Sequence, residues 1–258
     1  MDNIQTASEL VSKGESFDVL FWVGCAGSYD ARAQKVSRAF SEILQKAGIR
    51  FAILGDEEKC TGDPARRSGN EFLFQILALQ NIQTLNQYEV KKIVCTCPHC
   101  FNTLANEYPE LGGSYEVLHH SQFLDQLIRE GKIRIRDEEN YSTVSYHDSC
   151  YLGRVNMEYE APRSVIESLQ LEIKEMKRSR KNGLCCGAGG AQMFKEEERG
   201  ERRINEERTA DVLETGASVV VANCPFCITM LQDGIKAHDK QDHVMVYDLS
   251  ELVIQKMI

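Results

Sequence analysis

The chain alternates short apolar runs with longer segments of helical periodicity. Eight apolar runs bounded by polar or turn residues predict buried strands. They lie at 18–23, 50–54, 92–94 and 115–118, and again at 143–146, 171–176, 218–221 and 244–247. Helical patterns occupy 31–47, 70–85, 121–130, 194–214 and 249–257. Strands that alternate with helices are typical of parallel α/β sheets.

The spacing of the cysteines repeats once along the chain. Cys25 and Cys60 are separated by 34 residues, and so are Cys150 and Cys185. Each half then closes with a C-P-x-C motif. Matched features in the same order indicate an internal duplication. We therefore predict an α/β fold of two tandem pseudo-symmetric domains, 1–138 and 139–258, that break near the polar stretch 137–141.

Composition narrows the classes of function. The 258 residues include 30 Lys and Arg against 39 Asp and Glu, giving a net charge of −9, with 42% apolar and 27% charged residues. These proportions are typical of a globular protein, and the negative charge argues against nucleic acid as a partner. No apolar run reaches the roughly 18 residues of a membrane span, and residues 1–16 do not resemble a secretory signal. We therefore expect a cytoplasmic chain with no direct membrane span.

Two charged segments are expected to lie at the surface. Lys177, Arg178, Arg180 and Lys181 form a basic cluster, which suits either a solvated loop or a contact with an acidic partner. The segment 195–208 alternates charges and predicts a solvated helix face with salt bridges.

Ten cysteines are the main chemical signal, at positions 25, 60, 95, 97, 100, 150, 185, 186, 224 and 227. Patterned cysteines in a cytosolic chain are more often metal ligands or redox groups than disulfides. Half of them come at or just after the carboxyl end of a predicted strand, where open α/β sheets bind ligands. We therefore expect the cysteines of each half to meet at one rim of its sheet.

Thiolates are soft ligands that suit zinc or iron–sulfur clusters. A structural zinc site takes four ligands, usually as two C-x2–4-C knuckles. Each half has one such knuckle, and the second half offers five cysteines, Cys185 and Cys186 being adjacent. This set favours an iron–sulfur cluster, and zinc stays open as the alternative. The loop 187–190, which is rich in glycine, lets backbone N–H groups approach the cluster sulfurs.

These motifs resemble a known family. The segments 146–154, 184–190 and 223–227 are similar to the cysteine-rich CCG domain of heterodisulfide reductase and its relatives. The segments 58–67 and 97–104 resemble the first repeat of the iron–sulfur reductases that link electron-transferring flavoprotein to quinone. The resemblance covers roughly residues 21–252.

The resemblance implies one [4Fe-4S] cluster in the second half, cubane or non-cubane, and a candidate second [4Fe-4S] cluster in the first. The second motif is complete, and its ligands would be Cys150, Cys185, Cys186, Cys224 and Cys227. The first motif is degenerate, because Thr61 replaces one cysteine. Its ligands would be Cys25, Cys60, Cys97 and Cys100.

Three further residues have open roles. Cys95 is either an extra ligand or a small buried side chain on a strand. His147, three residues before Cys150, is a candidate catalytic proton donor, a hydrogen-bond donor to the cluster, or a structural residue. His99, within the first C-P-x-C motif, is expected to point away from the metal.

The resemblance favours an electron-transfer subunit of a larger oxidoreductase. Electrons would come from a flavoprotein or ferredoxin-like partner and go toward a quinone or a disulfide. The other subunits would include a ferredoxin-type or membrane iron–sulfur protein, which could hold this chain at the inner face of the membrane. A catalytic subunit of the heterodisulfide reductase type and a zinc-binding interaction module are the alternatives.

Overall fold

The computed structural model of the protein describes residues 4–136, 142–196 and 200–258. The expected domain break at 137–141 lies outside the described residues. Two four-stranded sheets form, and every strand pair in them is parallel. The strand orders are β2-β1-β3-β4 and β6-β5-β7-β8, so the two halves share one topology. The prediction of two pseudo-symmetric parallel α/β units is confirmed.

All eight predicted strands are present, with bounds that differ from the apolar runs by up to three residues at either end. They are β1 Val19–Trp22, β2 Phe51–Ala52, β3 Lys92–Cys95, β4 Glu116–His119, β5 Ser142–His147, β6 Leu171–Ile173, β7 Val219–Ala222 and β8 Met245–Tyr247. The helices of the first half are α1 Ala7–Ser12, α2 Gly24–Tyr29, α3 Ala31–Lys46, α4 Asp63–Arg67, α5 Glu71–Gln87, α6 Pro98–Asn102 and α7 His120–Arg129. Those of the second half are α8 Glu160–Ser168, α9 Ile204–Glu214, α10 Pro225–Ala237 and α11 Leu249–Lys256.

The helix predicted over 194–214 is wrong at 194–196 and 200–203, while 197–199 lie outside the described residues. The structure has a single 3-10 turn at Gln192–Phe194 and begins α9 only at Ile204. The segment 195–203 has no apolar side chain and includes Gly200. A helix gains most of its stability by burying an apolar face, and this segment has none to bury.

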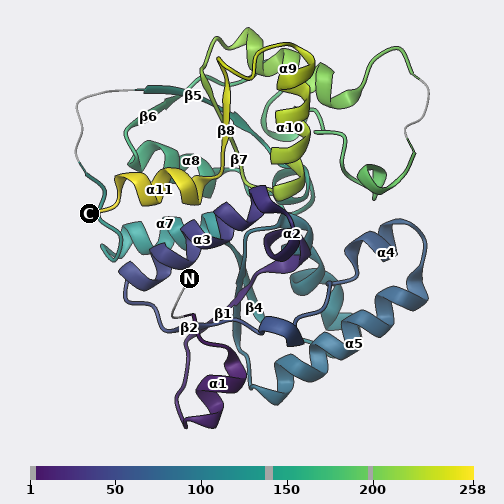
Figure 1. Ribbon diagram of the computed structural model, residues 1–258, viewed down its shortest axis with the longest axis vertical. Helices are drawn as coiled ribbons and strands as arrows, with labels where there is room; N and C mark the ends of the chain where they lie inside the picture. The colour runs from purple at the N-terminus through teal and green to yellow at the C-terminus, as the bar shows by residue number, and fades with distance from the viewer. Residues whose placement is uncertain (1–3, 137–141, 197–199) are drawn as a thin grey trace.

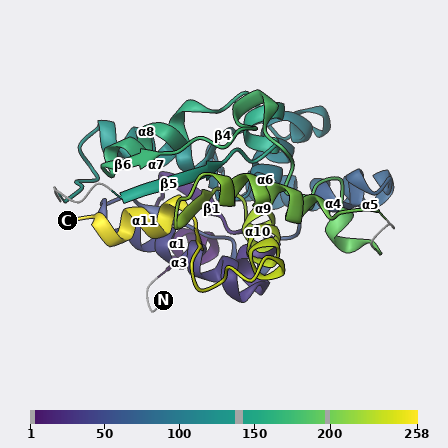
Figure 2. The ribbon, with the colours of Figure 1, turned by 90° about the horizontal axis from the view of Figure 1, so that it is seen from above.

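Helices of both halves form the layer between the two sheets (Figure 1). Helix α3 packs on α11, and α7 packs on α8, so each pair joins the halves. The central core combines Phe21, Phe40 and Phe123 of the first half with Tyr146 and Leu249 of the second. Figure 2 shows the same arrangement from above, with α11 next to α3. The two sheets are therefore held together by one continuous core.

The outer face of each sheet has a core of its own. Helices α1 and α5 cover the first sheet, where Leu10 and Phe74 pack with Leu20 and Trp22. Helices α9 and α10 cover the second, where Val212 and others pack with Val220 and Ala222. Residues alternate between the two faces along each strand. Trp22 and His147, the last residues of β1 and β5, both point to the outer side of their sheets.

Candidate functional site

The carboxyl ends of the strands bring the cysteines of each half together, as the topology requires. In the first half, Cys25 lies in α2 just after β1, and Cys60 lies in the loop before α4. Cys97 is the residue before α6, and Cys100 lies within it. These four line a pocket with an empty volume of about 380 Å³, including its open mouth.

The four thiols of the first set are arranged as two pairs. Cys25 and Cys60 share a hydrogen bond, which lowers the pKa of Cys60 to about 7, and a backbone N–H of Gly62 also points at this sulfur. Cys97 and Cys100 share another, which holds the pKa of Cys97 well below its usual range. Two thiols are thereby poised as thiolates, the form that binds metal.

The five thiols of the second set form one connected chain. Hydrogen bonds between sulfurs link Cys150 to Cys185, Cys185 to Cys186, Cys186 to Cys227 and Cys227 to Cys224. The bonds from Cys150 and Cys186, together with the N–H of Gly187, lower the pKa of Cys185 strongly. Three of the five sulfurs are almost fully buried.

The two sets touch each other. The thiols of Cys97 in the first set and Cys224 in the second lie close enough for each to shift the pKa of the other. Next to it, the ring of His99 stacks on Tyr151, with ring centroids 4.0 Å apart, and meets the edge of Phe226 at 5.6 Å. His99 Nδ1 hydrogen-bonds Asp63 over 2.9 Å. This contact raises the pKa of His99 against the opposite effect of burial.

Cys95 is not part of the first set. It is fully buried on β3 and does not line the pocket. Its thiol points at the carbonyl oxygens of Cys97 and Leu118, at 3.7 and 3.9 Å. This is the environment of a small buried side chain, which was one of the two interpretations open for it.

Thr61 stands where the second half has Cys186. Its hydroxyl lies 3.9 Å from the sulfur of Cys100, while Cys186 hydrogen-bonds Cys227, the equivalent of Cys100. The side chain thus keeps the same neighbour in both halves. The alignment of the two repeats located this residue, but only the structure shows that its hydroxyl faces the cysteine set.

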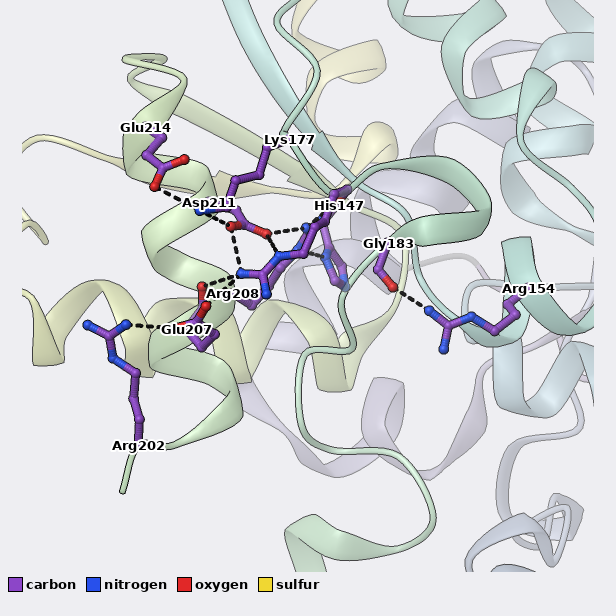
Figure 3. A network of polar contacts seen from close by, with 10 residues as sticks. His147, Arg154, Lys177, Gly183, Arg202, Glu207, Arg208, Asp211 and Glu214 are labelled. Carbon is purple, nitrogen blue, oxygen red and sulfur yellow. Dashed lines mark hydrogen bonds and ion pairs between the residues drawn. The ribbon is translucent and has the colours of Figure 1, made fainter. Parts of the chain in front are cut away.

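His147 lies beside the second set. Its ring also contacts Arg208, as Figure 3 shows. One of its ring nitrogens and the sulfurs of Cys186 and Cys227 all lie within 4.8 Å of one another. Arg208 Nε donates to His147 Nδ1 over 2.9 Å. Burial, reinforced by the charge of Arg208, lowers the pKa of His147 to about 3. The ring is therefore neutral near pH 7.

The prediction of a solvated charged face over 195–208 is wrong at Arg208, which is 0% exposed. It pairs with Asp211, which Arg178 also contacts. The sequence held a signal for this: Arg208 lies four residues before the buried Val212, on the same side of α9. Within the basic cluster, Lys177 pairs with Glu214, and Arg180 pairs with Glu160. These charges are therefore engaged within the chain.

Two polar residues that the sequence did not single out, the partly buried Glu58 and the fully buried Asn81, support the first set. The carboxylate of Glu58 accepts the backbone N–H groups of Val23 and Gly24, at 3.1 and 2.6 Å. The amide of Asn81 on α5 accepts from the N–H of Lys59 and donates to the carbonyl of Cys60. Both contacts fix the backbone next to a cysteine of the set.

The donor chemistry of both sets fits an iron–sulfur cluster. All nine donors are thiols, the ligands that hold such clusters. Four thiols suit a cubane cluster, and five connected thiols exceed the four ligands of a zinc site. The N–H groups of Gly62 and Gly187 lie 3.5 and 3.3 Å from a cysteine sulfur of their set, in position to stabilise thiolates.

Comparison with known proteins agrees with this geometry. A family model described as a cysteine-rich domain, CCG, matches residues 19–105 and again 144–232. The two matches correspond to the two sheets with their cysteine sets. The chain belongs to the CCG cysteine-rich domain family and carries the domain twice.

Three relatives span nearly the whole chain. It is 47% identical over 99% of its length to a probable iron-sulfur-binding oxidoreductase FadF of Bacillus subtilis, covering 36% of that protein. It is 42% identical over 96% of its length to an EtfAB:quinone oxidoreductase of Syntrophomonas wolfei, covering 35% of it. It is 35% identical over 93% of its length to a component of the dihydromethanophenazine:CoB–CoM heterodisulfide reductase of Methanosarcina barkeri, covering 59% of it. The chain thus spans between about a third and three fifths of these proteins.

No helix in the part of the chain that the structure describes is long and apolar enough to cross a membrane.

Proposed function

We propose that this chain is an electron-transferring part of a larger oxidoreductase, with an iron–sulfur cluster in each half. The observation that carries the proposal is the contact between the two sets at Cys97 and Cys224. Two redox groups held in contact form a relay, whereas two structural metal sites would gain nothing from touching. An iron–sulfur cluster supplies one-electron transfer.

Each repeat, 1–138 and 139–258, would hold one [4Fe-4S] cluster. The first would be bound by Cys25, Cys60, Cys97 and Cys100, as a cubane. The second would be bound by Cys150, Cys185, Cys186, Cys224 and Cys227, whose fifth thiol is suited to a non-cubane cluster. The low pKa values of Cys60, Cys97 and Cys185 support metal binding, since it requires deprotonated sulfur.

The relatives suggest the direction of electron flow. One is named for transfer from EtfAB to quinone and another as part of a heterodisulfide reductase. Electrons would reach this chain from a flavoprotein or ferredoxin-like partner and leave toward a quinone or a disulfide. A membrane iron–sulfur partner would hold the chain at the inner face of the membrane.

A catalytic disulfide reductase is the second candidate. It is favoured by the five connected thiols of the second set, one more than a cubane cluster takes. The hollow beside this set is lined by Cys150 and Cys186 together with Pro98 and His99 of the first half, so a substrate there would contact both repeats. Turnover of a disulfide by the isolated, reduced chain would distinguish this activity from simple electron transfer.

The test is the content of iron and acid-labile sulfide in anaerobically purified protein. We expect about eight iron atoms per chain, falling by about four in a Cys185→Ser/Cys186→Ser variant, since each cluster holds four. A Cys95→Ser variant is the matched control and should keep its iron. Stoichiometric zinc without iron under the same handling would contradict the proposal and favour the interaction module.

A further inference from the structure

A buried arginine and a buried histidine form a hydrogen-bonded pair (Figure 3). The histidine of this pair lies beside the second cysteine set. His147 ends β5, Arg208 lies on α9, and both are 0% exposed. Arg208 Nη1 donates to the carbonyl oxygen of Arg178 at 2.7 Å and to the carboxylate of Asp211 at 3.1 Å. Its Nε donates to His147 Nδ1 at 2.9 Å. The guanidinium is thus held in one orientation by acceptors from three sides.

This hydrogen bond determines where the histidine carries its hydrogen. An arginine Nε is always a donor and never an acceptor. His147 Nδ1 must therefore accept, and the neutral ring keeps its hydrogen on Nε2. Nε2 cannot then offer a lone pair to a metal. Arg208 restricts His147 to the role of an N–H donor.

The N–H of His147 lacks an acceptor among the described residues. Nε2 is buried and has no hydrogen-bond partner there. Buried donors are almost always satisfied, because leaving one unpaired costs roughly 1–3 kcal/mol. The ring lies beside the sulfurs of Cys186 and Cys227. An acceptor bound between these thiols would satisfy it.

We propose that Arg208 positions His147 to donate its Nε2–H to a sulfur of the cluster held by the second set. The inference rests on the proposed function and assigns Arg208 as a positioning residue and His147 as a hydrogen-bond donor to the cluster, neither a metal ligand nor a proton donor to substrate. A hydrogen bond to a cluster sulfur stabilises the added electron and raises the reduction potential. At the equivalent position of the first half stands Trp22, whose buried indole N–H likewise has no partner among the described residues, so the histidine with its arginine is what distinguishes the second half.

The test is pulsed EPR of the reduced full chain, purified anaerobically with ¹⁵N-labelled histidine. We expect a weak ¹⁵N coupling on the second cluster, and its loss in His147→Phe with iron content unchanged. In that variant the equilibrium constant for one-electron reduction should fall about tenfold, a shift of about 59 mV to more negative potential. The unmodified labelled protein carries the main signal, so the test does not depend on how a variant folds.

Variants of the arginine and a matched control complete the test. Arg208→Met should lose much of the coupling, and Arg208→Lys, which keeps a donor for Nδ1, should retain more of it. His120→Phe removes another fully buried histidine, one that binds Asp248, and should leave coupling and potential unchanged.

Three results would overturn the inference. A strong coupling typical of a directly bound nitrogen would show that His147 is a ligand. The absence of coupling at full iron content would show that His147 does not contact the cluster. An equal shift in His120→Phe would make the effect non-specific. Each of these leaves the proposed function intact, whereas protein without iron would overturn both.

Discussion

The two halves of this chain share a scaffold and differ in the residues that face the cysteine sets. In both, a glycine with positive φ follows the loop cysteines, Gly62 at +89° and Gly187 at +97°. Each turns its N–H toward the sulfur two residues earlier. The scaffold thus keeps the backbone geometry of the site. The chemistry differs at several side chains, among them Thr61 against Cys186, Trp22 against His147 and His99 against Phe226.

This difference shows which features the fold requires and which the chemistry requires. The turn at the glycine and the sulfurs that line each rim are common to both halves, so they serve any metal cluster at this place. The fifth thiol and the Arg208–His147 pair belong to the second half alone. We therefore expect the second cluster to be the specialised one and the first to be an ordinary relay.

The largest expected effect comes from exchanging the residues that differ. Cys186→Thr should give the second half the pattern of the first, with loss of its distinct EPR signal and appearance of a cubane-like one. Thr61→Cys should add a fifth thiol next to Cys100, which the Thr61 hydroxyl already faces. EPR of the reduced protein, with iron content, measures both.

The swap has a conservative control. Thr61→Ser keeps the hydroxyl and should leave both signals as they are. If Cys186→Thr leaves the second signal unchanged, the fifth thiol does not determine the cluster type, and the contrast between the halves fails.

The second largest effect is expected from removing the contact between the two sets. Cys97→Ser should disturb both clusters, because Cys97 lies against Cys100 on one side and Cys224 on the other. Cys25→Ser should affect the first cluster alone, since its hydrogen bond is to Cys60. We expect each variant to lose about four iron atoms, and only Cys97→Ser to shift the EPR signal of the second cluster. Identical second signals would show that the sets do not communicate.

Replacing the glycine of the shared turn by alanine should destabilise the protein more in the first half than in the second. A Cβ on Gly62 would lie 2.8 Å from the Phe74 ring and 3.2 Å from its Cα, whereas one on Gly187 would meet the flexible end of Met230 at 3.2 Å. Gly62→Ala should cost about 3 kcal/mol and Gly187→Ala about 2 kcal/mol in free energy of unfolding, since both also force a left-handed alanine. Thermal unfolding measures this.

A third glycine separates steric clash from backbone strain. Gly48 has a φ of +68° and open space around its Cβ position. Gly48→Ala should cost about 1 kcal/mol from backbone conformation alone. Equal losses at all three positions would show that packing around the two sites adds nothing.

The smallest effect concerns the caps of two equivalent helices. The ring of His119 caps α7 in the first half, and the carboxylate of Asp248 caps α11 in the second. Burial, together with His120, holds the pKa of His119 well below its usual range. Below about pH 6.5, the pKa of a histidine in the unfolded chain, the unfolded chain binds a proton at His119 that the folded chain does not bind. Stability should therefore fall with acid by about 1.4 kcal/mol per pH unit.

Replacement of the histidine isolates that effect. His119→Asn keeps a capping side chain that does not titrate. In urea unfolding between pH 7 and 5, the free energy of unfolding of this variant should fall less steeply than that of the unmodified protein, by about 1.4 kcal/mol per pH unit. An unchanged slope would mean that His119 does not govern the acid sensitivity of the first half.

Much of the fold could be predicted because its signals are local. Apolar runs located all eight strands, and equal spacing between cysteines revealed the repeat. The failure at 194–196 and 200–203 has a physical cause, since charge and helix propensity say nothing about whether a partner surface exists to bury the segment. The position of Arg208 was missed for the related reason that a charged residue is assumed to lie in water.

Cysteine spacing and strand pattern were enough to predict that nine cysteines would gather in two sets, because parallel strands of one topology end at one edge. How the sets face each other follows from tertiary packing alone. The contact of Cys97 with Cys224, the stacking of His99 on Tyr151 and the bond from Arg208 to His147 join residues far apart in the sequence. Such contacts depend on how helices of both halves pack into one core, and no local pattern records that packing.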